Sequence, residues 1–385
     1  MPERLAIVCN SVPPYRAHFH RRVVEEMPEL RLHTLVSHTD ARWPTVEMPE
    51  INLHRFDGGD DVFRQHLPLR SWREWRRAGR MIQFLRRERV DAVLIQGYNE
   101  VGRLRLLNWA SRSGLRVLFW SDSNVHGDHA RGLKLLVKRA LLGWVQRRCD
   151  AILVCGRLGR AYWRRYGVPD EKLFVSPVEP DYAAFAGEAG GVNEDPPAGL
   201  ADCPGVDRWL LYSGRLTEVK RVDRLIDAFN ALAPEFPGWG LAVAGSGDLE
   251  PALRARVDPA AADRVRWLGF VPSEERLAAV YRACDVLVLP SSYEPWALVV
   301  NEAAAAGLAL VATGVVGAAP ELIRSGRNGW VVPEGDQEAL VEAVRETMRN
   351  IEQRKAASAA VLADWRRDGD PIEGLRRALE TAEAK

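Results

Sequence analysis

Short apolar runs, rich in Val, Ile and Leu and mostly ending in Gly, Ser, Asn or Pro, recur along the whole chain. Uninterrupted runs of this kind predict strands that are buried on both faces, as in parallel sheets. In the first half they cover residues 5–9, 32–37, 92–96, 117–121, 151–155 and 173–176. In the second half they cover residues 209–212, 241–244, 265–268, 286–289, 308–312 and 330–332.

Segments between these runs repeat their apolar residues with the 3.6-residue period of a helix. Two examples are the stripes Trp75, Ala78, Ile82, Leu85 and Leu225, Ala228, Phe229, Leu232. Strands that alternate with helices are typical of doubly wound α/β domains. We therefore predict an α/β fold of two tandem Rossmann-like domains that face each other across a cleft. Ligands of such sheets bind at the carboxyl ends of the strands.

The domain boundaries follow from a segment without periodicity. Residues 187–208 are rich in Gly, Pro and acidic residues, which is typical of an exposed linker. The N-terminal domain is predicted to cover residues 1–186 and the C-terminal domain residues 209–367. The sequence Asp-Gly-Asp-Pro at 368–371 interrupts the helical pattern. Residues 368–385 are therefore predicted to form a final helix that crosses back to the first domain.

The composition, 47% hydrophobic and 27% charged over 385 residues, is that of an ordinary soluble chain and excludes collagen-like and disordered classes. The net charge of +1 conceals an asymmetry. Residues 1–185 contain 31 Lys and Arg against 21 Asp and Glu, whereas the remainder contains 22 against 31. Halves of opposite sign suggest two domains with different partners.

Five cysteines are scattered without a C-x-x-C spacing, which favours buried free thiols in a reducing compartment over a zinc or redox site. The N-terminus lacks the long apolar stretch of a signal peptide. The longest uncharged stretch, residues 303–320, is better explained as a helix followed by a strand than as a membrane span. We therefore expect a cytoplasmic protein.

The segment with the most candidate chemistry is PSSYEPWALVVNE, residues 290–302, which follows a predicted strand. Pro295 fits the first position of a helix, which places Glu294 at the N-cap. The N–H groups of the first turn would then be available to an anion; they belong to Trp296, Ala297 and Leu298.

Glu302 lies eight residues beyond Glu294, about 12 Å along a helix at 1.5 Å per residue. The paired carboxylates of a glycosidase stand roughly 5–9.5 Å apart. We therefore expect the two acids to hold different parts of one elongated ligand. The alternative is that Glu294 merely complements the helix dipole while Glu302 is solvated.

Two more clusters follow strands of the second half. Arg215 and Lys220, in SGRLTEVKR at 213–221, offer a planar fork and a compact point charge, which together suit a diphosphate. Two solvated cations at the start of a helix are the alternative. Gly245 and Gly247 form a G-x-G whose third glycine is replaced by Glu250. This is a weak dinucleotide fingerprint but a reasonable tight turn for the approach of a base or ribose.

In their order along the chain, SGRL-x4-KR (213–221), AGSG (244–247), LGF (268–270) and PSSYEPWALVVNEAAAAG (290–307) resemble the donor half of the retaining glycosyltransferases called family 4, which have the GT-B fold and an E-x7-E motif. The resemblance covers residues 209–332; residues 13–16 and 175–185 are similar to stretches of some members. It implies that Arg215 and Lys220 hold the diphosphate of a nucleotide-sugar. It also implies that Glu294 contacts the sugar hydroxyls and that Glu302 holds the ribose. Further substrate-binding positions would be Trp296, Ala297, Leu298, Val299, Gly214, Gly245, Gly247, Tyr15 and Arg16.

The chain departs from the family pattern in three places. Ala297 stands where the family usually has Gly, which alters the approach of the backbone to a phosphate. The glycine-rich turn after the first strand is replaced by VPPYR at 12–16. The His near the fourth strand is replaced by WSDS at 120–123, with His126 close by. These changes concern the sugar and the acceptor more than the donor site.

The resemblance implies transfer with retention and without an enzyme nucleophile. Arg215, Lys220 and helix N–H groups would stabilise the departing diphosphate, which itself helps to deprotonate the acceptor. The scheme needs no metal and no other cofactor, since the nucleotide-sugar is a co-substrate. The D-x-D at 368–370 lies outside the predicted cleft. A polar loop that could also bind a metal contains His126, His129, Asp122 and Asp128.

Two predicted helices of the first half are strongly basic. Residues 70–89 contain eight Arg and two Glu with Trp72 and Trp75, and residues 133–149 contain five basic and no acidic residues with Trp144. Such helices can lie on an anionic membrane, where they would bring a lipid-linked acceptor to the cleft, or they can simply carry a solvated basic face. Specific nucleic-acid binding is not expected, because no reader motif is present.

The sequence thus predicts a retaining, metal-independent hexosyltransferase. It would move a sugar from a nucleotide-sugar to a glycan, lipid-linked or small-molecule acceptor in the cytoplasm, with the inner face of the membrane as a peripheral site. One alternative is a Rossmann-type oxidoreductase, which the missing third glycine disfavours. The other is a non-catalytic nucleotide- or carbohydrate-binding module, which the joint presence of the cations at 215 and 220 and the acids at 294 and 302 disfavours.

Overall fold

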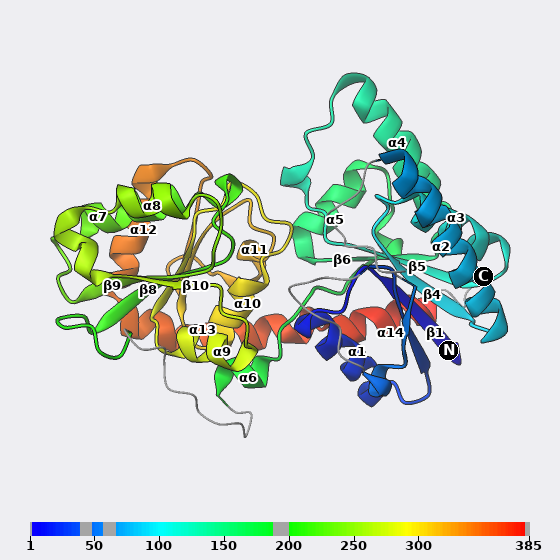
Figure 1. Cartoon of the computed structure of the whole chain (residues 1–385), viewed down its shortest axis with the longest axis horizontal. Helices are drawn as coiled ribbons and strands as arrows, with labels where there is room; N and C mark the ends of the chain where they lie inside the picture. Colours follow the sequence, from blue (N-terminus) through cyan, green and yellow to red (C-terminus); the bar gives the residue numbers. More distant parts are fainter. Residues whose placement is uncertain (1, 39–47, 57–66, 188–199, 382–385) are drawn as a thin grey trace. The chain divides into compact units, whose positions relative to one another are not determined.

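The computed structural model describes residues 2–38, 48–56, 67–187 and 200–381 (Figure 1). They form two compact units. The first consists of Met1–Val178 together with Gly369–Lys385, and the second of Glu179–Asp368. Each unit is an α/β domain with a parallel sheet, which confirms the predicted pair of Rossmann-like domains. Most of the linker predicted at 187–208 lies outside the described residues.

The first unit has a seven-stranded parallel sheet with the order β3-β2-β1-β4-β5-β6-β7. Its strands are β1 (Arg4–Cys9), β2 (Arg31–Val36), β3 (Leu53–Arg55), β4 (Ala92–Gln96), β5 (Arg116–Ser121), β6 (Ala151–Val154) and β7 (Leu173–Val175). Its helices are α1 (Pro14–Glu26), α2 (Leu67–Arg87), α3 (Val101–Arg112), α4 (Gly132–Gln146), α5 (Gly156–Arg165) and α14 (Pro371–Thr381). All six runs predicted in this half are strands. The edge strand β3 was missed because its three residues are half-buried or exposed and include two polar side chains.

The second unit has a six-stranded parallel sheet with the order β10-β9-β8-β11-β12-β13. Its strands are β8 (Arg208–Ser213), β9 (Trp239–Ala244), β10 (Val265–Gly269), β11 (Val286–Leu289), β12 (Ala309–Thr313) and β13 (Gly329–Val332). Its helices are α6 (Tyr182–Ala186), α7 (Val222–Leu232), α8 (Glu250–Arg256), α9 (Glu274–Arg282), α10 (Leu298–Ala305), α11 (Ala319–Leu322), α12 (Gln337–Arg349) and α13 (Ile351–Asp368). All six runs predicted here are strands as well.

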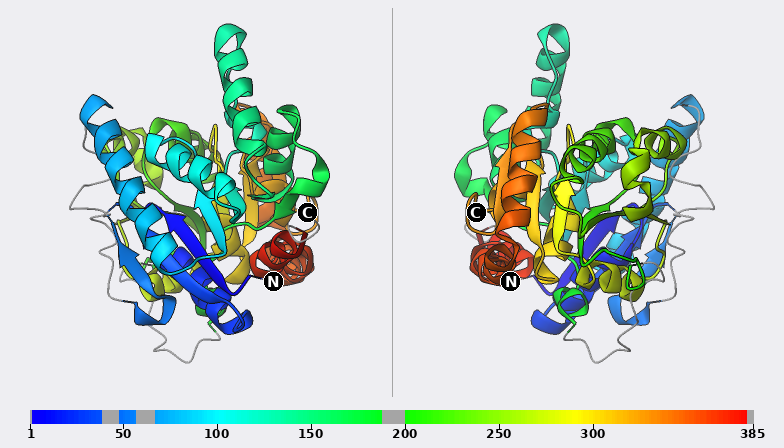
Figure 2. Two further views of the ribbon diagram at one scale, coloured as in Figure 1. Left: turned by 90° about the vertical axis from the view of Figure 1, so that its right-hand side faces the viewer. Right: turned by 90° about the vertical axis from the view of Figure 1, so that its left-hand side faces the viewer.

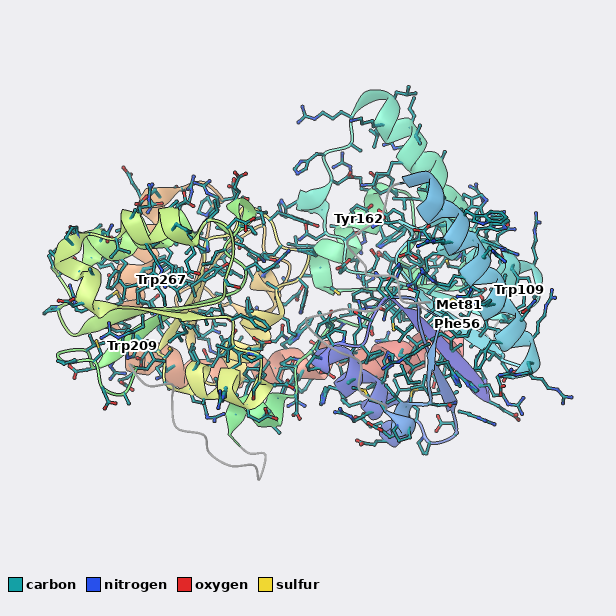
Figure 3. All side chains as sticks on the ribbon, viewed as in Figure 1. Phe56, Met81, Trp109, Tyr162, Trp209 and Trp267 are labelled. Carbon is teal, nitrogen blue, oxygen red and sulfur yellow. The ribbon has the colours of Figure 1, made fainter. Side chains whose placement is uncertain are left out.

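Helices cover both faces of each sheet, so that the strands are buried on both sides as the apolar runs require (Figures 1 and 2). Tyr162 of α5 is 2% exposed in the core of the first unit, and Trp209 of β8 is 3% exposed in that of the second (Figure 3). In both sheets the order reverses beside the first strand of the unit, between β1 and β4 and between β8 and β11. Such a reversal opens a crevice at the carboxyl ends of the strands, where ligands of this fold bind.

The first unit is completed by the last helix of the chain. Helix α14 packs on β6, β7 and α1. Its residue Gly374 lies so close to β7 that a Cβ would stand 1.9 Å from the Val175 carbonyl oxygen. Asp370, just before α14, accepts the backbone N–H of Ile372 at 2.8 Å and forms an ion pair with Arg22 at 2.8 Å. The D-x-D at 368–370 therefore ends in a helix-capping residue.

The units divide at Val178, ahead of the boundary that the sequence placed at residue 186. The reason is α6, which packs on α9 and α10 of the second unit. Tyr182 accepts a hydrogen bond from Asn301 at 2.9 Å, and Phe185 stacks edge-on against Tyr281. Among the helices that the structure describes, none combines the length and apolarity that crossing a bilayer requires.

Candidate functional site

The predicted donor residues lie at the switch point of the second sheet. Arg215 and Lys220 follow β8, and Glu294 follows β11, the strand paired with β8. The two loops are joined by a backbone hydrogen bond of 2.8 Å from Ser292 N to Val219 O. The topology therefore brings together two segments that are distant in sequence.

An ion pair connects these loops. The Lys220 ammonium, at the end of the short 3-10 helix η4 (Glu218–Lys220), contacts the Glu294 carboxylate. The same Oε1 atom of Glu294 accepts a 3.1 Å hydrogen bond from the Ser291 hydroxyl. Both side chains are largely buried, with 16% of Lys220 and 8% of Glu294 exposed. Burial strengthens such a pair, because less water screens the two charges.

Arg215 supplies a second cation beside this pair. Its backbone oxygen accepts a 2.8 Å hydrogen bond from the buried Tyr212 hydroxyl. Burial and then the Glu294 carboxylate raise the pKa of Tyr212, whereas Arg215 lowers it, so both charges lie close to this hydroxyl. The side chain of Arg215 is exposed, and within the described residues its guanidinium has no hydrogen-bond or ion-pair partner. Arg215 is therefore the cation of this site that remains available to an anion.

The glycines after β8 and β9 let two loops pack backbone against backbone. A Cβ on Gly245 would stand 1.8 Å from the Gly214 carbonyl oxygen, and one on Gly247 would stand 2.3 Å from that of Leu216. Gly214 and Gly245 both have a positive φ, of 147° and 141°. The direction of the missing Cβ at 245 and 247 is thus filled by the neighbouring loop. These glycines position the Arg215 loop.

The helix that carries Glu302 begins later than predicted. Helix α10 starts at Leu298, with Ala297 as its N-cap, instead of at Pro295 with Glu294 as N-cap. Backbone hydrogen bonds from Gly317 N to Glu294 O (3.2 Å) and from Ala318 N to Trp296 O (2.8 Å) hold residues 294–296 to the loop after β12. A Cβ on Gly317 would stand 2.1 Å from the Pro295 carbonyl oxygen, so this pairing requires glycine there.

Because of this shift, the first-turn amides of α10 are those of Leu298 and Val299, and Trp296 and Ala297 precede the first turn. The Trp296 side chain is 2% exposed and donates from Nε1 to Asn301 Oδ1 at 3.0 Å, so it is a core residue. Ala297 has φ +78°, a left-handed conformation that is strained for any residue with a Cβ. The backbone thus keeps the conformation that suits glycine although an alanine is present.

Glu302 lies within α10 and is buried, with 8% of its surface exposed. Its Oε2 atom accepts a 2.7 Å hydrogen bond from the Tyr281 hydroxyl of α9. Burial raises the pKa of Glu302 to about 7, although the Tyr281 hydrogen bond lowers it. The alternative of a solvated Glu302 is therefore wrong. The separation of 12 Å along a helix does not apply either, because Glu294 precedes the helix.

In the first unit, Tyr15 and Arg16 lie in the first turn of α1, after β1. Arg16 lines a cavity of about 230 Å³ at the carboxyl ends of the strands, together with Asn10, Gln96, Trp120 and Asp122. Burial raises the pKa of Asp122, and the Arg16 guanidinium opposes that shift. Tyr15 lines a smaller neighbouring cavity with Arg16 and Trp120. The two predicted residues are thus at the ligand-binding edge of their sheet.

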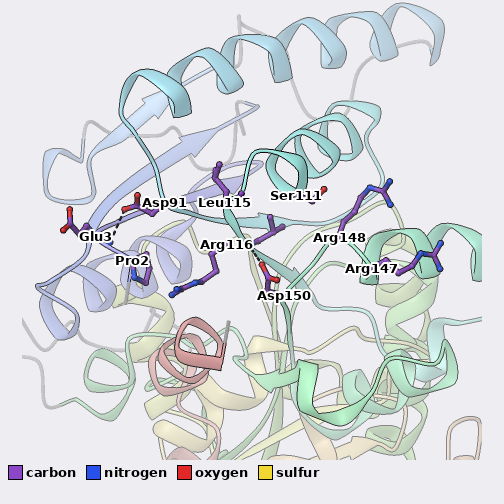
Figure 4. A pocket seen from close by; sticks show the side chains of 11 residues that line it. Pro2, Glu3, Asp91, Ser111, Leu115, Arg116, Arg147, Arg148 and Asp150 are labelled. Atoms are coloured by element: carbon purple, nitrogen blue, oxygen red, sulfur yellow. Dashed lines mark hydrogen bonds between the residues drawn. The ribbon is translucent and has the colours of Figure 1, made fainter. Parts of the chain in front are cut away.

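A larger cavity of about 850 Å³ lies at the opposite, amino edge of the first sheet (Figure 4). Two of its carboxylates accept hydrogen bonds from backbone N–H groups at the amino ends of strands. Asp91 accepts from Arg4 N of β1 at 3.0 Å, and Asp150 accepts from Val117 N of β5 at 2.9 Å. No group of three His, Cys, Asp or Glu side chains suited to a metal occurs among the residues that the structure describes. Asp128 of the candidate metal loop instead pairs with Lys138 at 2.8 Å.

Comparison with known proteins identifies the family. Residues 204–361 match the family model described as glycosyl transferases group 1. The lipopolysaccharide core biosynthesis mannosyltransferase LpsB of Rhizobium meliloti is 30% identical over 272 residues, which cover 67% of this chain and 69% of LpsB. The chain belongs to the group 1 glycosyltransferases.

Other relatives match this chain over a shorter part of their length. The putative colanic acid biosynthesis glycosyltransferase WcaL of Salmonella typhimurium is 30% identical over 53% of this chain and 48% of WcaL. Glycogen synthase of Mycobacterium tuberculosis is 39% identical over 39% of this chain and 36% of that enzyme. The chain thus spans less than half the length of these two proteins.

Solved structures show the same GT-B fold over almost the whole chain. Anabaena HepE in complex with UDP and glucose is 15% identical with a TM-score of 0.70 and covers 100% of both chains. Sucrose-phosphate synthase from Thermosynechococcus elongatus is 18% identical with a TM-score of 0.73, over 99% of this chain and 98% of that one.

Several residues of the candidate site carry no signal in the sequence. Tyr212, whose hydroxyl donates to the Arg215 backbone oxygen, lies within the apolar strand β8 and has the pattern of a core residue. Tyr281 lies in α9 on an ordinary apolar stripe. Gly317 is the exception, since a glycine in the loop after β12 can mark a close backbone approach.

Proposed function

We propose that this group 1 glycosyltransferase moves a hexosyl group from a nucleoside-diphosphate sugar to a glycan, lipid-linked or small-molecule acceptor, with retention of configuration at the anomeric carbon. The observation that carries the proposal is the grouping of Arg215, Lys220 and Glu294 at the switch point of the second sheet. One carboxylate and two cations leave a net positive charge there, which suits a diphosphate.

Each donor-site residue has a role in this scheme. The guanidinium of Arg215 and the ammonium of Lys220 bind diphosphate oxygens, and the amides of Leu298 and Val299 add hydrogen-bond donors at the start of α10. Glu294 orients Lys220 and accepts hydrogen bonds from the transferred sugar. The Glu302 carboxyl, whose pKa burial raises to about 7, binds the ribose hydroxyls.

Catalysis in this scheme is electrostatic. Negative charge develops on the diphosphate as its bond to the sugar breaks, and preorganised cations and amides stabilise that charge. The acceptor hydroxyl loses its proton to the leaving diphosphate and attacks the same face of the sugar, so the configuration is retained. No protein nucleophile and no metal take part, and the nucleotide-sugar is a co-substrate.

The polar cavity of the first unit at Arg16 and Asp122 is proposed as the acceptor site, because an amide, a carboxylate and an aromatic ring beside a guanidinium suit a hydroxyl-rich ligand. A cytoplasmic location agrees with the five cysteines, all of which are buried and unpaired. What the related structures bind supports a uridine donor: HepE was solved with UDP and glucose, and an Escherichia coli structure with UDP-2-fluoro glucose.

A thermal-shift screen of UDP, GDP, ADP and their sugar conjugates tests the donor. A ligand present at 100 times its Kd stabilises the native state by about 2.7 kcal/mol. We expect one diphosphate to raise the Tm, Arg215→Ala to remove that rise, and Arg327→Ala to keep it, because Arg327 is an exposed arginine elsewhere in the same unit.

Turnover separates the proposal from its alternatives. We expect the protein to hydrolyse the stabilising nucleotide-sugar slowly. In the presence of an acceptor, we expect NMR to show a transfer product with the same anomeric configuration as the donor. Binding without any turnover would favour a non-catalytic module, and stabilisation by a nicotinamide or flavin nucleotide alone would favour an oxidoreductase.

A further inference from the structure

Helix α4 of the first unit is apolar on two opposite faces. One face packs into the core through Leu142 and Val145, both 0% exposed. On the other face, Leu133 is 75% exposed, and Leu136 and Val137 are each 61% exposed. Soluble monomers rarely expose neighbouring large aliphatic side chains in this way, so the outer face calls for a partner.

These residues continue along the whole helix. At 100° per residue, one line of α4 carries the set Leu133, Leu136, Val137, Ala140 and Trp144, named here the α4 stripe. From Leu133 to Trp144 the stripe is about 17 Å long at 1.5 Å per residue. Its last member, Trp144, is half-buried and packs against the core of the unit, with the Arg148 guanidinium 3.9 Å from the centroid of its ring, so the exposed part of the stripe ends at Ala140.

Cations flank the α4 stripe and no acid interrupts it. Lys134 lies on one side of the stripe and Arg139 on the other, both exposed, and residues 130–149 contain no Asp or Glu. Neither cation has an ion-pair partner in the part of the chain that the structure describes. Lys138, on the inward side, is instead paired with Asp128. Lys134 and Arg139, which flank the stripe, are thus available to negative charges on a ligand that covers it.

The start of α2 offers a second surface of the same kind. Trp72 is 61% exposed and Trp75 is 45% exposed, with the guanidinium of Arg76 5.8 Å from the Trp72 ring and that of Arg105 4.4 Å from the Trp75 ring. In Figures 1 and 2 the starts of α2 and α4 point to the same side of the first unit. Trp and Arg side chains favour the boundary between water and lipid.

Charge complementarity decides between possible occupants of the α4 stripe. A second copy of this chain, related by a two-fold axis, would bring Lys134 and Arg139 against the same cations of its partner. An anionic bilayer offers negative headgroups to the flanking cations and acyl chains to the stripe. A basic helix with one exposed apolar line is suited to lie in the interface rather than to cross the membrane.

We propose that the first unit docks on an anionic phospholipid bilayer by laying the α4 stripe into the headgroup region, with the Trp72 end of α2 as a second contact. The proposal goes beyond glycosyl transfer and does not depend on it, because a protein that lost turnover would still dock.

Vesicle co-sedimentation of the full chain tests the proposal. We expect binding to phosphatidylglycerol–phosphatidylcholine vesicles, little binding to phosphatidylcholine alone, and weakening by salt. Each cation at an anionic surface is worth about a fivefold change in affinity, so Lys134→Glu with Arg139→Glu should weaken binding by about 25-fold or more. Arg327→Glu, the same reversal at an exposed arginine of the second unit, should leave it unchanged.

The apolar contribution needs its own variant. Leu133→Ser, Leu136→Ser and Val137→Ser together should weaken vesicle binding by about tenfold or more, because the exposed aliphatic surface is lost. All three residues are exposed, so the melting temperature should stay near that of the wild type, which circular dichroism checks. Phe270→Ser, at a 51% exposed aromatic of the second unit, is the matched control.

A fluorophore reports the insertion directly. The native cysteines are all buried, so an environment-sensitive dye can be placed on Leu136→Cys or, as a control, on Arg327→Cys. We expect a blue shift on anionic vesicles at 136 alone. Equal binding of wild type and triple serine variant, absence of binding, or a dimer in light scattering that the triple variant dissociates would each overturn the proposal.

Discussion

The Lys220 ammonium and the Glu294 carboxylate form an ion pair although they lie 74 positions apart in the chain. The pair exists because β8 and β11 are neighbours in the sheet, so the loops after them meet at the switch point. It joins a cation proposed to bind the diphosphate to an acid proposed to bind the sugar. Occupation of one of these sites therefore affects the other.

Removal of one partner of this pair should reduce both stability and activity. Lys220→Ala leaves a largely buried carboxylate without its cation, at a cost of about 3 kcal/mol or less, because 16% of Lys220 is exposed. The transfer rate should fall by about 10²–10³, the usual effect of losing one preorganised donor. Urea unfolding and initial rates measure the two effects.

The double variant Lys220→Met, Glu294→Gln is the control for this prediction. It removes both charges, so its stability should return close to that of the wild type while its activity stays low. Recovery of activity together with stability would show that the pair is structural and would contradict its role in donor binding.

Arg215→Ala should affect activity without affecting the fold. The Arg215 side chain is exposed, so the free energy of unfolding should change by no more than about 0.5 kcal/mol. Loss of a side chain that donates hydrogen bonds to the diphosphate should lower kcat/KM by about 10². Steady-state kinetics beside Arg327→Ala, which should behave as the wild type, check this. Equal activity of the two variants would remove Arg215 from the site.

Ala297→Gly should stabilise the protein. Ala297 has φ +78°, a conformation that destabilises a residue with a Cβ by about 1–2 kcal/mol. Glycine removes this strain, but part of the gain in stability is lost because glycine loses more backbone entropy on folding. The net gain should be about 1 kcal/mol, or roughly 2–4 °C in Tm for a domain of this size. Ala297→Val should lower the Tm, because a β-branched side chain tolerates this conformation least. Calorimetry decides, and a lower Tm for the glycine variant would contradict the prediction.

Glu302 should make stability fall as pH rises from about 4.5 to 7. Its pKa is raised from 4.5 in the unfolded chain to about 7 in the folded protein, so within this window the native state holds a proton that the unfolded state has lost. The contribution is fully present below pH 4.5 and is lost as pH passes 7. It amounts to about 3 kcal/mol.

Glu302→Gln isolates this contribution from those of other titrating groups. The variant keeps an oxygen that can accept the Tyr281 hydrogen bond but cannot ionise. The difference in unfolding free energy between wild type and variant should change by about 3 kcal/mol between pH 4.5 and 7.5. A constant difference across this range would show that Glu302 is ionised in the native state.

Gly374→Ala should loosen the last helix. Its Cβ would stand 1.9 Å from the Val175 carbonyl oxygen, so α14 must move away from β7, at a cost of about 1–3 kcal/mol. Hydrogen exchange should increase in α14 and β7. Gly79→Ala in α2 is the matched control: its Cβ meets the movable Arg105 guanidinium at 3.3 Å, so the variant should be as stable as the wild type or more so.

The strands were predictable because burial on both faces imposes continuous apolar runs, and each of the runs predicted in the two halves is a strand. Strand β3 was missed because an edge strand with polar residues has no such run. The start of α10 was misplaced because Pro295 fits a helix start locally. The loop that follows β12 forms backbone hydrogen bonds with residues 294–296, so the helix begins only at Leu298.

Of the candidate site, the charged residues could be predicted but their local partners could not. Arg215, Lys220 and Glu294 stand out because charged residues follow apolar strands. The burial of Glu302 and the role of Tyr281 depend on how α9 packs against α10, which no periodicity encodes. The burial of Trp296 likewise depends on a contact with Trp365 in α13.

The placement of α14 has a consequence for synthesis. Because residues 369–385 belong with residues 1–178, the second unit is an uninterrupted insertion between two segments of the first. On the ribosome, residues 179–368 can complete their own sheet as soon as they emerge. The earlier-made unit must wait for α14 until residues 371–381 have been synthesised, so a truncation ahead of α14 would damage the domain that was translated first.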